Sequence, residues 1–123
     1  MHMSSKLLTF LLAGGLWLAL AVPAMAHAAL VSSDPAPNSA VAAPKAIKLT
    51  FSEKLAPRFS GFSLSMREHG MAIKLGGKMS EDGKSIIGTP AETLMTGAYT
   101  VSWHAASTED GHRMEGSFNF TVK

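Results

Sequence analysis

Cysteine is absent from all 123 residues of the sequence. A small secreted domain often depends on disulfides, so this chain must rely on its hydrophobic core for stability. Any metal site must then use histidine, methionine, carboxylate or terminal amine donors, because no thiolate is available. Charge is also scarce, since only 16% of the residues are charged and 11 Lys and Arg nearly balance 9 Asp and Glu. Without a basic cluster or a basic amphipathic helix, we expect neither a nucleic-acid partner nor a lipid surface.

A long hydrophobic run occurs only near the amino terminus. Lys6 precedes an almost wholly apolar stretch, residues 7–21, and Pro23 ends it. The run is shorter than the roughly 20 residues that a membrane-spanning helix needs. Ala24-Met25-Ala26 then fits the small-x-small pattern of a signal peptidase site. We therefore predict that residues 1–26 are a signal peptide cleaved after Ala26. Residues 27–123 would form one exported domain without a membrane span.

Helical periodicity with capping residues is missing from the rest of the chain, and alternation of apolar and polar residues takes its place. Four segments alternate clearly, residues 47–51, 62–66, 99–103 and 118–122, and three shorter ones are residues 29–31, 71–75 and 85–87. Turn-forming pairs separate them, among them Gly76-Gly77, Asp82-Gly83 and Asp110-Gly111. About seven short strands in under a hundred residues predict an all-β fold. We expect a small antiparallel Greek-key β-sandwich or barrel of the immunoglobulin-like type.

Two places in the sequence carry residues suited to bind a metal. Cleavage after Ala26 would make His27 the first residue, with its free amine and its imidazole on one residue. Asp110 and His112 flank Gly111, which permits a tight turn that aims a carboxylate and an imidazole at one point. Taken alone, the second stretch also suits an ordinary polar turn.

Several ordered motifs together resemble the CopC family of periplasmic copper-resistance proteins over essentially the whole predicted mature chain. They are HAALVSSDPAPN at 27–38, LTFSEKL at 49–55, GAYTVSW at 97–103 and DGH at 110–112. The resemblance implies a Cu(II) site formed by His27, Asp110 and His112, with Glu53 as a further axial or outer candidate. Nitrogen and oxygen donors of this kind suit Cu(II). Glu53 alone would read as a solvated charge at a strand end.

Some members of that family carry a methionine-rich loop that resembles a Cu(I) site, and thioethers favour Cu(I). The corresponding stretch here keeps Met66, His69 and Met71 but is shorter and has fewer methionines. Met66 fits a core position equally well, because it continues the face of the strand at 62–66. Met79, in a glycine-rich turn, is an alternative ligand, and we interpret Met95 and Met114 as packing residues.

The resemblance implies a carrier or chaperone that sequesters or delivers Cu(II), and not an enzyme. Two rival functions stay open at this point. A histidine-brace copper monooxygenase would also use an amino-terminal histidine, and a metal-free immunoglobulin-like module would bind partners only. Family analogy suggests as partner a CopD-type inner-membrane copper transporter or another copper-resistance protein. We expect the mature chain to be a monomer.

Overall fold

A computed structural model describes residues 28–123, so the predicted signal peptide and His27 lie outside the described residues. Within this range the chain forms nine strands and one short 3-10 helix, η1 (Pro57–Phe59). The strands are β1 (Leu30–Asp34), β2 (Ala40–Val41), β3 (Ile47–Phe51), β4 (Gly61–Met66), β5 (Met71–Ile73), β6 (Leu75–Met79), β7 (Ser85–Pro90), β8 (Gly97–Ala106) and β9 (Arg113–Val122).

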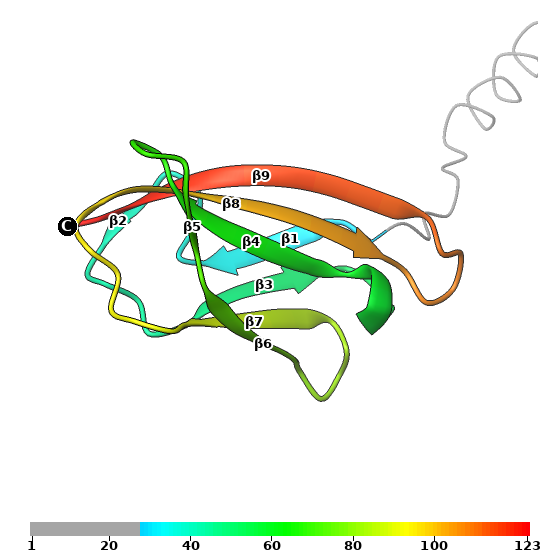
Figure 1. The fold of residues 1–123 in the computed structure, drawn as a ribbon. Helices are drawn as coiled ribbons and strands as arrows, with labels where there is room; N and C mark the ends of the chain where they lie inside the picture. The colour runs from blue at the N-terminus through cyan, green and yellow to red at the C-terminus, as the bar shows by residue number, and fades with distance from the viewer. Residues whose placement is uncertain (1–27) are drawn as a thin grey trace, which may run out of the picture.

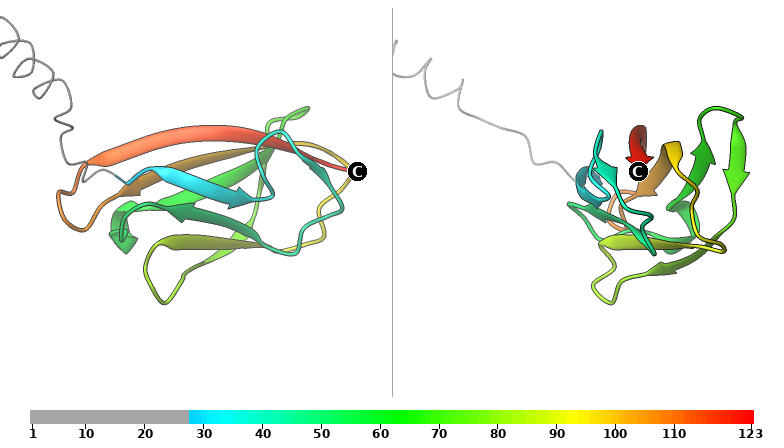
Figure 2. Two further views of the ribbon diagram at one scale, coloured as in Figure 1. Left: turned by 180° about the vertical axis from the view of Figure 1, so that it is seen from behind. Right: turned by 90° about the vertical axis from the view of Figure 1, so that its left-hand side faces the viewer.

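The strands form two sheets that face each other as a sandwich, as Figure 1 and the end-on view of Figure 2 show. One sheet has the order β1-β3-β7-β6 and the other the order β2-β9-β8-β4-β5. All pairings are antiparallel except that of β2 with β9. The predicted all-β sandwich is therefore confirmed, with nine strands where about seven were expected.

The two additional strands have separate causes. β2 is only two residues long and pairs in parallel with the end of β9, so it is too short for alternation to reveal. The predicted segment 71–75 divides at Lys74 into β5 and β6, because the chain passes from one sheet to the other at this residue. Gly76 and Gly77 therefore lie inside β6, and their interpretation as a turn is wrong.

The longest element of the described chain is the hairpin of β8 and β9, ten residues in each strand, paired from Gly97↔Val122 to Ala106↔Arg113. The inward residues of the two strands fill the space between the sheets. The ring of Tyr99 stacks on that of Phe120 at 5.5 Å, and the ring of Trp103 meets that of Phe51 edge-on at 5.2 Å. The alternation at 99–103 thus reflects a core-facing side of β8, on which Tyr99 and Val101 are buried and Trp103 is partly buried.

The indole of Trp103 leaves little room for a side chain at Gly116, its register partner in β9. A Cβ atom added to Gly116 would lie 2.5 Å from Cζ2 and 2.8 Å from Cε2 of the indole. The indole also packs edge-on against the buried ring of Phe51, which limits how far it can move. We expect Gly116→Ala to lower the free energy of unfolding by about 1–3 kcal/mol.

Urea denaturation measures this effect, and Gly77→Ala is the matched control. A Cβ atom at Gly77 meets no heavy atom within 4 Å, so this strand glycine should accept alanine without loss. Equal stability of the two variants would contradict the steric role assigned to Trp103.

Candidate metal centre

The turn between β8 and β9 places Asp110 and His112 on one exposed loop. Gly111 has φ 68°, a left-handed conformation that glycine adopts without strain, and its N–H donates to the carbonyl of Ser107 at 3.0 Å. The backbone N–H of His112 donates to Oδ1 of Asp110 at 2.9 Å. Ser107, at the start of the loop, is buried, and its hydroxyl accepts a hydrogen bond from the N–H of Glu109 at 3.1 Å. The two predicted ligands are thus set close together by local hydrogen bonds.

The segment after β3 joins this loop to the beginning of the described chain. Ala29 and Ser52 exchange two hydrogen bonds, from the Ala29 N–H to the Ser52 hydroxyl at 3.0 Å and from the Ser52 N–H to the Ala29 carbonyl at 2.9 Å. Two residues further on, the Lys54 carbonyl accepts from the N–H of Thr108 at 3.0 Å. The start of β1 and the turn between β8 and β9 therefore lie at the same end of the sandwich (Figure 1).

Glu53 stands between these two connections, in the bend that follows β3, and is half-buried. The structure thus places it in the segment that links the start of the described chain to the loop. Within residues 28–123, however, no three His, Asp or Glu side chains are grouped so that they could hold a metal ion. Asp110 and His112 are a pair here, and the third predicted ligand, His27, lies outside the described residues.

The second predicted set lies at the other end of β8. Met66 and Met71 are register partners across β4 and β5, while His69 is exposed in the turn that joins these strands. Met66 is 6% exposed and belongs to the core, whereas Met71 is 51% exposed. Since Met66 pairs with Tyr99 near the start of β8, this set is on the order of 25–30 Å from the Asp110 loop.

Met66 and Met71 line a cleft of about 380 Å³ that a third thioether, that of Met95, also borders. Met95 is 64% exposed, so its interpretation as a packing residue is wrong. Met114, interpreted in the same way, is also exposed, at 36%. The Tyr99 hydroxyl donates to the Met95 carbonyl at 2.7 Å, and both residues line the cleft. Burial of this ring raises the pKa of the Tyr99 hydroxyl, so it remains a proton donor at neutral pH. Met79, the alternative ligand, lines a different cavity from within β6.

These features define a small β-sandwich that carries a histidine and carboxylate turn at one end and a thioether-lined cleft at the other. No helix among residues 28–123 has the length and apolarity to cross a membrane. The family model described as "CopC domain" matches residues 30–123, and the chain belongs to the CopC family.

Individual relatives agree with this assignment. The chain is 43% identical to copper resistance protein C of Escherichia coli over 120 residues, which covers 92% of this chain and 94% of that relative. The crystal structure of PcoC, a methionine-rich copper resistance protein from Escherichia coli, superimposes with a TM-score of 0.74 at 43% identity over 80% of this chain and 100% of that one. CopC from Methylosinus trichosporium OB3b gives a TM-score of 0.70 at 33% identity, over 79% and 94% of the two chains.

The family settles the choice between the classes of function that the sequence left open. The chain is a homologue of copper resistance protein C, which favours a copper-handling protein over a metal-free interaction module. The same relationship places it with a non-enzymatic family and disfavours the monooxygenase alternative.

Proposed function

We propose that this chain is a periplasmic carrier that sequesters or delivers Cu(II) in copper resistance and homeostasis. One observation carries the proposal. The turn with Asp110 and His112 lies at the end of the sandwich where the described chain begins, immediately after His27 in the sequence. A short amino-terminal extension of β1 is therefore the segment best placed to supply the remaining ligands.

The proposed ligand set is the terminal amine and imidazole of His27, the carboxylate of Asp110 and the imidazole of His112. Glu53, in the neighbouring bend, is proposed as an axial or outer carboxylate. Three nitrogen donors and one oxygen donor in a tetragonal arrangement are the ligands that Cu(II) prefers. The amine becomes available only if the leader, residues 1–26, is removed after Ala26, and residues 27–123 then form the copper-binding domain.

The proposed partner is a membrane copper transporter of the CopD type or another copper-resistance protein, with which a monomeric carrier would exchange its ion. Exposure of Asp110 and His112 supports such exchange, because an ion held at the surface can be reached by ligands of a second protein.

Competitive titration of Cu(II) into the chain that begins at His27 tests the proposed function. We expect one tightly bound equivalent, with the spectroscopic signature of nitrogen and oxygen donors. An affinity no better than that of a generic amino-terminal peptide would contradict the proposal and favour a module without metal.

The methionine cleft supports a second candidate function, the binding of Cu(I). We propose that Met95 joins Met66 and Met71 there and replaces methionines that the shortened loop lacks, with His69 of the turn between β4 and β5 as a further candidate ligand. Met71→Leu and Met95→Leu should each weaken Cu(I) binding about tenfold, or 1.4 kcal/mol, because leucine keeps the volume and removes the thioether.

Anaerobic competition titration with Cu(I) measures this loss. Met79→Leu is the matched control, since its thioether lies in β6 on a separate cavity. If Met79→Leu weakens Cu(I) binding as much as Met95→Leu does, the cleft is not the site.

A further inference from the structure

The two sheets leave a gap along one side of the sandwich. β6 is the terminal strand of its sheet and pairs with β7 alone. In the facing sheet, β5 covers β4 only from Leu64 to Met66, so Gly61, Phe62 and Ser63 pair with β8 but with no strand on the other side. The free edge of β6 and the free half of β4 run along the same side of the molecule (Figure 1).

The hydrogen-bond pattern shows which backbone groups of β6 point into this gap. Just outside the strand, the Lys74 carbonyl accepts from the Ala91 N–H and the Ser80 N–H donates to the Ser85 carbonyl, both at 3.0 Å. In an antiparallel pair, residues that exchange hydrogen bonds alternate with residues that do not. Residues 76 and 78 therefore bond to β7, and residues 75, 77 and 79 turn their N–H and C=O groups outward.

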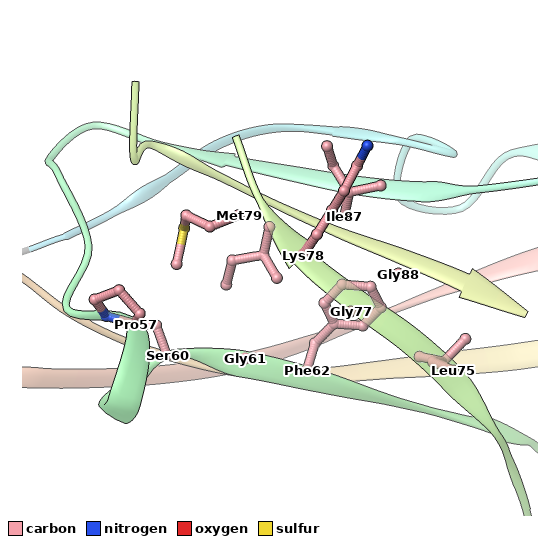
Figure 3. A pocket seen from close by; sticks show the side chains of 11 residues that line it. Pro57, Ser60, Gly61, Phe62, Leu75, Gly77, Lys78, Met79, Ile87 and Gly88 are labelled. Atoms are coloured by element: carbon pink, nitrogen blue, oxygen red, sulfur yellow. The ribbon is translucent and has the colours of Figure 1, made fainter. Parts of the chain in front are cut away.

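A cavity of about 320 Å³ lies beside β6. Figure 3 shows the side chains that line it. Its walls are mainly apolar: Pro57, Phe62, Leu75, Met79 and Ile86. The ring of Phe62 fills the space above Gly88, where a Cβ atom would lie 2.5 Å from its Cζ atom. Gly77 by contrast has no heavy atom within 4 Å of a Cβ position. The edge of β6 thus has both unused backbone groups and room beside them.

Charge decides what could occupy this edge. Residues 74–79 carry two lysines, Lys74 and Lys78, and no acid, and Lys78 is the one charged residue that lines the cavity in the described chain. Glu81 and Asp82 follow in the turn after β6. The Asp82 carboxylate is already engaged there, because it accepts from the Ser80 hydroxyl at 2.6 Å and the Lys84 N–H at 3.0 Å.

A second copy of this chain is a poor occupant, because pairing β6 with β6 would gather Lys78 of both copies on one face of the joined sheet. We propose that the edge of β6 binds an extended acidic segment of a partner protein by strand addition. Side chains of that segment would alternate between the two faces of the sheet. Those on one face would be apolar and contact Leu75, Met79 and Phe62, and those on the other face would be acidic and lie near Lys78. Backbone hydrogen bonds would form with residues 75, 77 and 79.

The probe is an acetylated and amidated five-residue peptide that alternates valine and glutamate, titrated into the isotope-labelled chain and followed by NMR. We expect the amides of Leu75, Gly77 and Met79 to shift and to gain protection from hydrogen exchange. A matched peptide that alternates valine and lysine should bind more weakly, by up to about fivefold. Lys78→Glu should reverse this preference.

Two further variants separate strand addition from simple charge attraction. Gly77→Pro removes an outward N–H without touching the ladder to β7 and should abolish protection, while Gly77→Ala keeps the N–H and should retain it. If Gly77→Pro does not fold, protection of the Leu75, Gly77 and Met79 amides on peptide binding still separates the two, because charge attraction alone protects no backbone N–H. The proposal is overturned by equal binding of both peptides, by no binding, or by shifts at β1 or β5 in place of β6. Concentration-dependent shifts without peptide would overturn it too, in favour of a second copy.

Discussion

Adding a single residue before His27 should weaken Cu(II) binding by roughly a hundredfold or more, about 3 kcal/mol. The added residue converts the terminal amine of His27 into a peptide nitrogen, which has no basic lone pair to offer the metal. It also breaks the chelate in which amine and imidazole belong to one residue. The measurement is competition titration of the chain that begins at His27 against the chain that begins one residue earlier.

A second comparison shows which donor is responsible. His27→Ala in the chain that begins at residue 27 keeps a terminal amine and removes only the imidazole, so it should lose affinity as well. Residue Ala28 is fully buried, which means that the end of the chain is held against the sandwich up to the position next to His27. An extension should therefore leave the fold unchanged, and circular dichroism checks this. Equal Cu(II) affinity of the chain that begins at His27 and the extended chain would contradict the proposed amino-terminal site.

Most of the fold follows from alternation, and its limits are physical. The segment 47–51 alternates strictly because one face is buried against the other sheet, and the structure gives β3 the same bounds. Alternation fails at Gly76 and Gly77, since residues without side chains show no preference for either face. Alternation misses the division at Lys74 for a different reason: a segment that changes sheets can keep its alternation while it changes partners.

The sequence predicts the two candidate copper sites, at opposite ends of β8, to different degrees. Asp110 and His112 are two residues apart around a glycine, so their proximity follows from local turn geometry. The segment that carries Glu53 is joined to this loop by the long-range hydrogen bond from the Thr108 N–H to the Lys54 carbonyl, which a resemblance can suggest but spacing cannot. Met95 could not be placed with Met66 and Met71 from spacing, because the long-range pairing of Met66 with Tyr99 across β4 and β8 brings the two segments together.

The two ends of β8 therefore offer donors of different chemical softness. Imidazole and carboxylate groups at the Asp110 loop suit Cu(II), whereas thioethers at the opposite end suit Cu(I). The strand between them is ten residues long and its hairpin is continuous with the core, so the two ends should not exchange ligands. Variants at one end should consequently leave the other unaffected, which allows the two sites to be tested independently.

His112→Ala should reduce Cu(II) affinity by roughly a hundredfold, about 3 kcal/mol, because it removes an imidazole donor from the metal. Asp110→Ala should also weaken binding, for two reasons. It removes the carboxylate donor, and it removes the acceptor of the 2.9 Å hydrogen bond from the His112 backbone, so the loop loses the contact that sets the position of His112. Asp110→Asn separates these effects, since an amide oxygen can keep the hydrogen bond without the charge.

Met66→Leu and Met71→Leu are the matched controls at the other end of β8, and both should keep wild-type Cu(II) affinity because thioethers are poor ligands for Cu(II). Leucine preserves their volume, so the buried position of Met66 should tolerate it at a cost below about 1.5 kcal/mol. Competition titration of each variant with Cu(II) gives the comparison. If the methionine variants lose Cu(II) while His112→Ala keeps it, the Asp110 loop is not the Cu(II) site and the methionine cleft is the copper centre.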